Sequence, residues 1–161
     1  MGYIVLGILI FLLDIITKYA AEVSLKLIDT IPLWKNVFHL TYVENRGIAF
    51  GMFSGERVIF IVVTILVLAM LAVIYAKTKQ AQRTRFMKYA MVLIMGGAIG
   101  NLFERLIKGY VVDFLDFRLI HFPVFNVADI AVCVGAGLLM IHFLLTEDKE
   151  EASKEGDASD E

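Results

Sequence analysis

The chain has 161 residues, of which 59% are hydrophobic, with a mean hydropathy of +0.76 and a formal net charge of −2. Soluble domains usually contain about 45–50% apolar residues, so this composition excludes an ordinary soluble domain and favours a membrane protein. The single cysteine, Cys133, excludes an internal disulfide and CxxC redox chemistry. We expect Cys133 to pack as a small apolar residue within a helix.

Four apolar segments are long enough to cross a bilayer, since a helix needs about 20 residues to span a hydrocarbon core of ~30 Å. They cover residues 3–21, 58–76, 86–107 and 127–146. Backbone groups inside lipid must be satisfied within each segment, and four segments are too few for a closed strand barrel. The sequence therefore predicts an all-α membrane protein with four transmembrane helices, whose membrane domain is residues 1–146.

The charges outside these segments predict the orientation. The loop between the second and third segments carries only basic charges, from Lys77, Lys79, Arg83, Arg85 and, just beyond, Lys88. By the positive-inside rule this loop and both termini are cytoplasmic, and residues 22–57 and 108–126 face outward. Residues 147–161 hold eight of the 17 acidic residues, and we expect them to form a disordered cytoplasmic tail.

The first outer segment, residues 22–57, is too long for a simple connector. Within it Phe38, Leu40 and Tyr42 alternate with less apolar neighbours, a pattern typical of a short strand. We therefore expect a small β-like element on the outer surface.

Charged residues within apolar segments cost roughly 2.5–3.5 kcal/mol each on insertion scales, so they are functional candidates. The predicted orientation brings six polar residues to the outer ends of the segments: Asp14, Lys18, Asn101, Glu104, Arg105 and Asp129. These residues come from three helices and meet at one depth. A proton path across the bilayer would instead place such groups from face to face.

Each candidate also has a structural interpretation. Asp14 and Lys18 lie four residues apart, as in an ion pair that stabilises helix packing. Glu104 and Arg105 are equally consistent with interfacial anchors.

Three aspartates near the fourth segment have ordinary interpretations too. Asn126 followed by Asp129 fits a helix cap with an acid at the third helical position. Asp113 and Asp116 fall in the segment between the third and fourth helices, where loop carboxylates are normally solvated. Position alone therefore assigns no chemistry to these residues.

Other chemistries find little support. The three histidines, His39, His121 and His142, are far apart, and no HExxH or other metal-ligand spacing is present. We therefore expect no metal or cofactor. A serine–lysine pair using Ser24 or Ser54 stays open, although nothing favours it. The only basic cluster is explained by topology, so nucleic acid is not expected as a partner.

Five motifs resemble those of the bacterial lipoprotein signal peptidase (signal peptidase II) family over about residues 3–146. In chain order they are DIITK at 14–18, NRGIAFG at 45–51, GGAIGNLFER at 96–105, VVDF at 111–114 and FNVAD at 125–129. Each motif is short, but five in the same order and on the expected segments are specific.

The resemblance implies a membrane aspartic endopeptidase that removes signal peptides from diacylglyceryl-modified prolipoproteins, cutting just before the lipidated cysteine. It places the catalytic pair on Asp113 and Asp129. It assigns supporting or substrate-binding positions to Asp14, Lys18, Asn45, Gly47, Asn101, Arg105 and Asn126. The chain departs from the family at Glu104, where an aspartate is usual. The implied location is the bacterial cytoplasmic membrane, with the site near the outer face; we expect membrane lipids as partners and a monomer.

Two other functions stay open at this stage. A small proton-coupled transporter or channel would line its path with Asp14, Glu104 and Arg105, but it predicts polar residues at all depths and usually an internal duplication. Neither feature is present in the sequence. A non-catalytic assembly factor predicts that folded Asp113→Asn or Asp129→Asn protein keeps its activity in cells.

Overall fold

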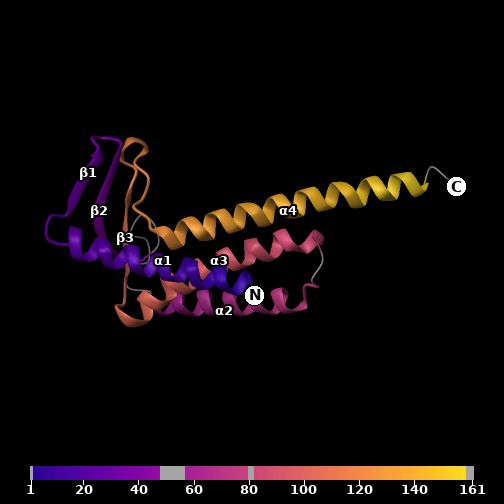
Figure 1. The fold of residues 1–161 in the computed structure, drawn as a ribbon, viewed down its shortest axis with the longest axis horizontal. Coiled ribbons are helices and arrows are strands. Elements are labelled where there is room, and N and C mark those ends of the chain that lie inside the picture. Colours follow the sequence, from indigo (N-terminus) through magenta and orange to yellow (C-terminus); the bar gives the residue numbers. More distant parts are fainter. Residues whose placement is uncertain (1, 48–56, 80–81, 159–161) are drawn as a thin grey trace.

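The computed structural model describes residues 2–47, 57–79 and 82–158, with side chains described up to Thr146 (Figure 1). Its helices are α1 (Gly2–Leu25), α2 (Arg57–Lys77), α3 (Gln82–Ile107) and α4 (Val127–Ala158). Each contains a stretch long and apolar enough to cross a membrane, at residues 2–25, 57–77, 84–107 and 127–146. The four predicted spans are thus confirmed, with α1 extending four residues further than expected.

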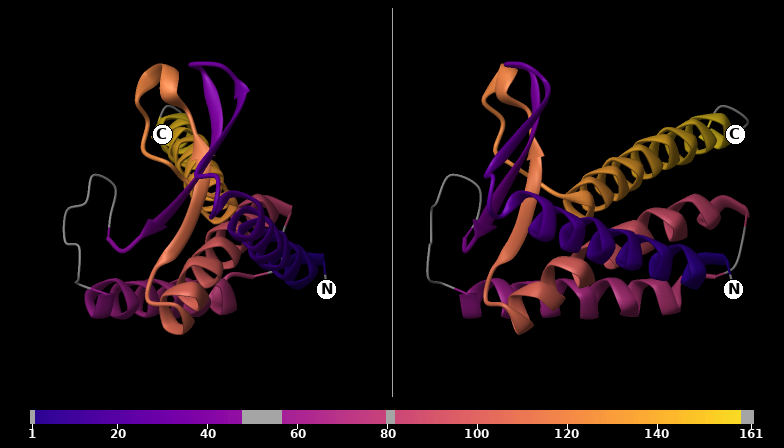
Figure 2. Two further views of the ribbon diagram at one scale, coloured as in Figure 1. Left: turned by 90° about the vertical axis from the view of Figure 1, so that its left-hand side faces the viewer. Right: turned by 60° about the vertical axis from the view of Figure 1, so that its left-hand side comes forward.

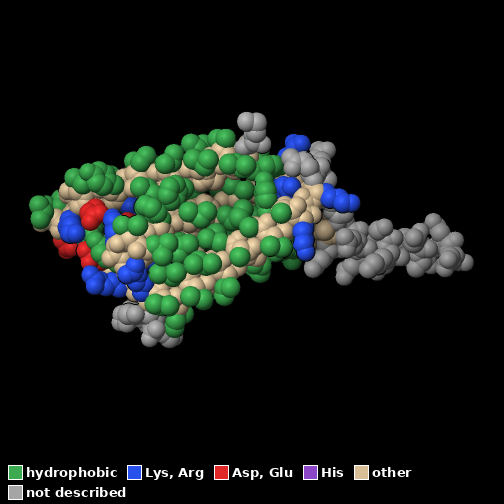
Figure 3. All heavy atoms as spheres, turned by 90° about the horizontal axis from the view of Figure 1, so that it is seen from below, with side chains coloured by type: hydrophobic (Ala, Val, Ile, Leu, Met, Phe, Trp, Pro, Cys, Tyr) green, Lys and Arg blue, Asp and Glu red, His purple; other side chains and the backbone are tan. Residues whose placement is uncertain are grey.

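The composition of the helices explains both their formation and their setting. The only prolines, Pro32 and Pro123, lie outside all four helices, so no helix loses a backbone hydrogen bond. Large apolar side chains such as Leu9, Leu66 and Leu144 remain more than half exposed along the bundle. Figure 3 shows this apolar surface, with charged side chains gathered at its two ends. Such an all-round apolar surface is suited to lipid.

α4 continues from Thr146 to Ala158, into the residues for which the sequence predicts a disordered tail, and that prediction remains untested. The added residues are rich in Glu, Lys and Ala, which have high helix propensity. Extending a helix that has already formed also avoids the cost of nucleation.

α3 is the central helix and contacts the other three (Figure 2). Small residues allow close approach on two of its faces. A Cβ atom added to Gly96 would lie 3.1 Å from the Gly7 carbonyl oxygen of α1, and one added to Gly97 would collide with the Ala128 carbonyl of α4. Small residues at such contacts are typical of helix packing in membranes.

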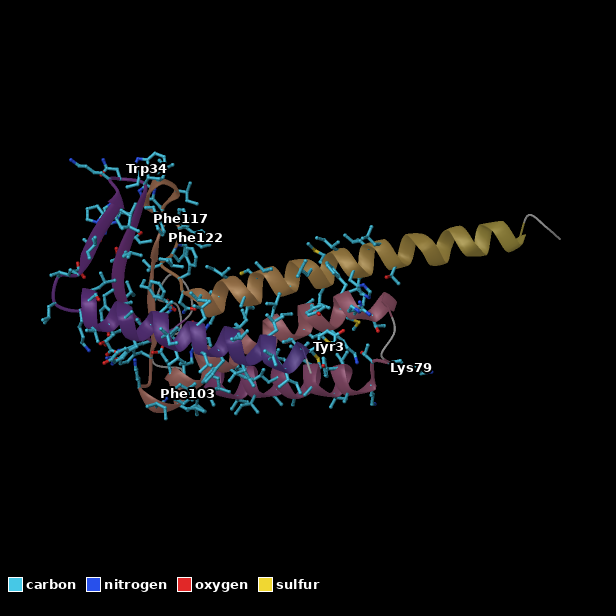
Figure 4. All side chains as sticks on the ribbon, viewed as in Figure 1. Tyr3, Trp34, Lys79, Phe103, Phe117 and Phe122 are labelled. Carbon is cyan, nitrogen blue, oxygen red and sulfur yellow. The ribbon has the colours of Figure 1, made fainter. Side chains whose placement is uncertain are left out.

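A three-stranded antiparallel sheet covers the end of the bundle opposite the loop that contains Lys79 (Figures 1 and 4). Its order is β1 (Thr30–Trp34), β2 (Phe38–Asn45) and β3 (Val111–Asp116), followed by a short 3₁₀ helix at Arg118–Ile120. The strand signal at residues 38–43 is therefore confirmed as part of β2. β3 was not predicted, since its partner lies about 70 residues earlier in the chain.

The sheet is attached to the C-terminal end of α1 by a small apolar core. Ala21 and Leu25 of α1 pack with Val112 and Phe114 of β3, and all four are buried. Because Val112 and Phe114 point toward α1, the intervening Asp113 points to the opposite face of the strand. The pleat of β3 thus directs Asp113 away from this core.

Candidate active site

Asp113 is buried in the sheet, which corrects the expectation of a solvated loop carboxylate. Its side chain is only 2% exposed. In the pairing of β2 with β3, Val43 lies opposite Asp113 and Asn45 lies opposite Val111, so Asn45 and Asp113 are diagonal neighbours on one face. The Asn45 Nδ2 donates to Asp113 Oδ2 at 2.8 Å, and the Asn126 Nδ2 donates to Asp113 Oδ1 at 2.6 Å.

This environment favours the protonated form of Asp113. Burial raises the pKa of the Asp113 carboxyl to about 7, and the negative charge of Asp129 acts in the same direction. The amide groups of Asn45 and Asn126 oppose the shift but do not cancel it. At neutral pH Asp113 is therefore poised to exchange a proton.

Asp129 and Asn126 form a reciprocal helix cap at the start of α4. The Asp129 backbone N–H donates to Asn126 Oδ1 at 3.0 Å, and the Asn126 backbone N–H donates to Asp129 Oδ2 at 3.1 Å. This is the geometry of a capping box, with aspartate in the place of the usual glutamate or glutamine. The predicted cap is thus confirmed, and through its amide Asn126 also links Asp129 to Asp113.

Asn101 of α3 holds the other oxygen of Asp129. Its Nδ2 donates to Asp129 Oδ1 at 2.8 Å, while its Oδ1 accepts from Lys18 Nζ at 2.7 Å and from Asn126 Nδ2 at 3.2 Å. Lysine has donors but no acceptor, so Lys18 fixes which end of the Asn101 amide faces Asp129. The structure thus brings the predicted residues of α1, α3 and α4 together.

Asp14 and Lys18 form the expected i,i+4 ion pair, with 2.7 Å between Nζ and Oδ2, and both side chains are almost wholly buried. The other oxygen of Asp14 accepts the Ala128 backbone N–H at 2.9 Å, which ties α1 to the first turn of α4. The Asp14 carboxylate lies directly over Gly100, where a Cβ atom would collide with it. A buried ion pair of this kind is stable only when its remaining hydrogen-bonding capacity is satisfied, as it is here.

The two aspartates border a cavity of about 550 Å³. Arg105 and Gly47 also line it, and the guanidinium of Arg105 lies over the Phe60 ring, 5.6 Å from the ring centroid. Arg105 and Glu104 therefore do not act as the surface anchors that their positions permitted, since Glu104 is buried and Arg105 reaches the site. Asn45 also lines the cavity, and the rest of the wall is apolar and comes from Phe122, Pro123, Val124, Phe125, Ile130, Cys133 and Val134.

Sequence reasoning missed part of this wall. Cys133 is exposed and lines the cavity, which corrects the expectation that it packs within a helix. It lies one turn after Asp129, and that spacing on a helix was the available signal. A second cavity of about 250 Å³ shares Arg105, Asp129 and Cys133 and extends toward Thr64 of α2.

Some predicted features lie elsewhere. The second motif continues through residues 48–51, which are outside the described residues, as is Ser54. Ser24 is exposed near the end of α1 and lines neither of the two cavities beside the aspartates. Within the described ranges, no group of His, Cys, Asp or Glu side chains is arranged to hold a metal ion.

Comparison with known proteins points to one family. The family model described as signal peptidase (SPase) II matches residues 6–145. A lipoprotein signal peptidase of Halothermothrix orenii is 46% identical over 142 residues, covering 88% of this chain and 94% of that protein. One from Caldanaerobacter subterraneus subsp. tengcongensis is 47% identical over 145 residues, covering 88% and 96%. None of these similarities supports a transporter.

Solved structures agree on the fold. A bacterial membrane enzyme determined by the in meso method at 2.3 Å resolution superposes with a TM-score of 0.84 at 31% identity, covering 92% of this chain and 90% of that one. A second, at 1.9 Å resolution, gives a TM-score of 0.79 at 32% identity, with coverage of 89% and 92%. The small sheet and the helical bundle therefore belong to an established membrane-enzyme architecture.

Proposed function

Because the chain belongs to the signal peptidase II family, we propose that Asp113 and Asp129 are the catalytic pair of an aspartic endopeptidase that removes signal peptides from prolipoproteins. The observation that carries the assignment is the shared Asn126, which contacts both carboxylates at the edge of one cavity. Two adjacent carboxyl groups that cannot comfortably both ionise are the basis of metal-independent peptide hydrolysis.

The two aspartates take different roles because their partners differ. Asp129 accepts a backbone N–H at the N-terminus of α4, a position that favours a carboxylate, and shares the cavity with Arg105. The ionised Asp129 takes a proton from water, whose oxygen adds to the scissile carbonyl carbon. Asp113 gives its proton to the carbonyl oxygen. When the tetrahedral intermediate collapses, Asp129 passes its proton to the leaving nitrogen, and Asp113 regains a proton from the intermediate.

The cavity suits a lipidated substrate. Apart from the aspartates, Asn45 and Arg105, its wall is formed mainly by apolar side chains such as Phe122, Phe125 and Val134. Acyl chains of a diacylglyceryl-modified cysteine fit such a wall, while the preceding peptide bond lies at the polar end beside Asp113. The second cavity, toward Thr64, offers another direction for the chain to leave.

The charge distribution supports an orientation with the site near the outer face. Lys77 and Lys79 lie at the end of the bundle opposite the sheet, as Figure 4 shows for Lys79. Under the positive-inside rule that end and both termini face the cytoplasm. Reporter fusions to either terminus test this orientation, and a reporter active only outside the cell would contradict it.

The test of the function uses purified protein in lipid and a diacylated prolipoprotein, with signal-peptide release as the readout. Asp113→Asn and Asp129→Asn should each reduce turnover by about 10²–10⁴-fold, the range of a lost general acid or base. Asp116→Asn is the matched control, since it changes another buried aspartate of the same strand that lies outside the cavity. A chelator should have no effect. Turnover that survives both active-site changes would support the non-catalytic assembly factor instead.

A further inference from the structure

Glu104 is a buried carboxylate, 2% exposed, that has no role in the chemistry described above. It accepts the Val112 backbone N–H at 2.8 Å through Oε2 and faces Lys18 Nζ at 3.5 Å through the same oxygen. Its other oxygen accepts from Lys108 Nζ at 2.9 Å. A carboxylate buried this deeply is costly unless it is fully paired, so these three contacts hold it in one place.

The contact with Val112 acts on the strand that carries Asp113. β3 pairs with β2 along one edge. On its other edge Leu115 forms a bridge with Phe125, and the N–H of fully buried Val112 is donated to Glu104 instead of to a strand. A buried N–H without a partner costs about 1–3 kcal/mol, so β3 is held at the position where Glu104 can reach it. The next residue along the strand is Asp113.

The contact between Glu104 and Lys18 connects Glu104 to Asp129. Lys18 donates to Asn101 Oδ1 at 2.7 Å, and the amide of Asn101 donates to Asp129 at 2.8 Å. One carboxylate is thus connected to Asp113 through a backbone N–H and to Asp129 through two side chains.

We propose that Glu104 is a positioning residue whose reach sets the separation of Asp113 and Asp129; the inference rests on the catalytic role proposed for these two residues. An aspartate at this position would be shorter by one C–C bond, about 1.5 Å. In this chain that shortening takes the carboxylate beyond hydrogen-bond distance of Val112 unless β3 moves. The length of the Glu104 side chain therefore matches the distance from α3 to β3.

The experiment compares Glu104→Asp, which keeps the charge but shortens the side chain, with Glu104→Gln, which keeps the length but removes the charge. A displacement of about 1 Å at reacting groups costs on the order of 100-fold. We expect kcat of Glu104→Asp to fall 10- to 100-fold with KM within about twofold, and the upper limb of its pH profile to shift. Glu104→Gln keeps its acceptor for Val112 and should lose less activity than Glu104→Asp.

The matched control is Glu22→Gln. Glu22 accepts from the same Lys108, at 2.7 Å, but contacts neither Val112 nor Lys18, so its kcat and pH profile should equal those of the wild type. A role for charge alone predicts the reverse order, with Glu104→Asp the more active variant. That order, or an unchanged pH profile in Glu104→Asp, would overturn the inference. Failure of both variants to fold would also overturn it, because Glu104 would then determine folding and not spacing.

The same experiment separates this inference from the proposed function. If the wild type cleaves, Asp113→Asn does not, and Glu104→Asp retains full kcat, only the positioning role is lost. If the wild type fails to cleave, or Asp113→Asn remains active, the assignment of the catalytic pair is lost instead.

Discussion

Two aspartates of β3, Asp113 and Asp116, have pKa values that are shifted in opposite directions. Asp113 and Asp116 lie three residues apart and are both buried. The hydrogen-bond partners of Asp113 are neutral amides, so burial dominates and raises the pKa of Asp113 to about 7. Burial would raise the pKa of Asp116, but this effect is outweighed by the Thr41 hydroxyl at 2.6 Å and the Arg118 guanidinium at 2.8 Å. These two partners lower the pKa of Asp116.

The difference shows that burial alone does not make a carboxyl group a proton donor. A cation within hydrogen-bond distance keeps a buried aspartate ionised, as at Asp116, and gives it a structural role. Amide donors and a neighbouring carboxylate leave the proton available, as at Asp113. Replacing an amide partner by a cation, or a charged group by a neutral one, therefore tests this comparison.

The largest effect is expected from giving Asp113 a cation. Asn45→Lys should ionise Asp113, reduce kcat by about 10²–10⁴-fold and move the upper limb of the pH profile to lower pH. Asn45→Leu removes the same amide without adding charge, so it separates the lost hydrogen bond from the added charge. An Asn45→Lys enzyme whose upper limb stays near pH 7 would contradict the comparison.

A smaller effect on activity is expected when the pH of the wild-type enzyme is raised. Asp113 must be protonated to donate, so kcat/KM for a diacylated substrate should fall above pH 7 and approach a tenfold loss per pH unit. Activity that remains level up to pH 9 would show that Asp113 is not the donor.

The smallest effect on activity is expected from a substitution of Asp116. Asp116→Asn should leave kcat within twofold but weaken the contacts with Thr41 and Arg118, reducing stability by about 1–2 kcal/mol at pH 7. The pKa of Asp116 is lowered, so the stability that its charge supplies is present above its unfolded value of 3.8 and is lost as the pH falls. Thermal unfolding in detergent at pH 7 and at a pH well below 3.8 measures the difference, which should shrink at the lower pH.

Much of the architecture follows from local sequence, because spans and caps depend on contiguous residues. The four apolar segments, the Asp14–Lys18 pair and the cap formed by Asn126 could each be recognised within a few residues of chain. The motifs then supplied the candidate catalytic pair, which local pattern had interpreted as a loop residue and a cap.

The remaining features depend on pairing between distant residues. The burial of Asp113 requires Asn45, 68 residues earlier, and the packing of β3 against α1, neither of which leaves a local signal. Glu104 looked like an interfacial anchor because its contacts with the Val112 backbone N–H and with Lys18 join separate elements, and neither contact has a local signature in the sequence. For Cys133 the position one turn after Asp129 was a local indication, but the cavity that it lines forms only in the folded protein.

The first turn of α4 is held by both α1 and α3, and this has a consequence for how the protein loses activity on heating. Helix ends normally fray before the helix melts, but here Asp14 of α1 holds the Ala128 N–H and Asn101 of α3 holds Asp129. Fraying of this turn therefore requires α1 and α3 to separate from α4. Heat inactivation should accordingly follow the same curve as dissociation of the helices, which makes enzymatic activity a direct reporter of an intact bundle.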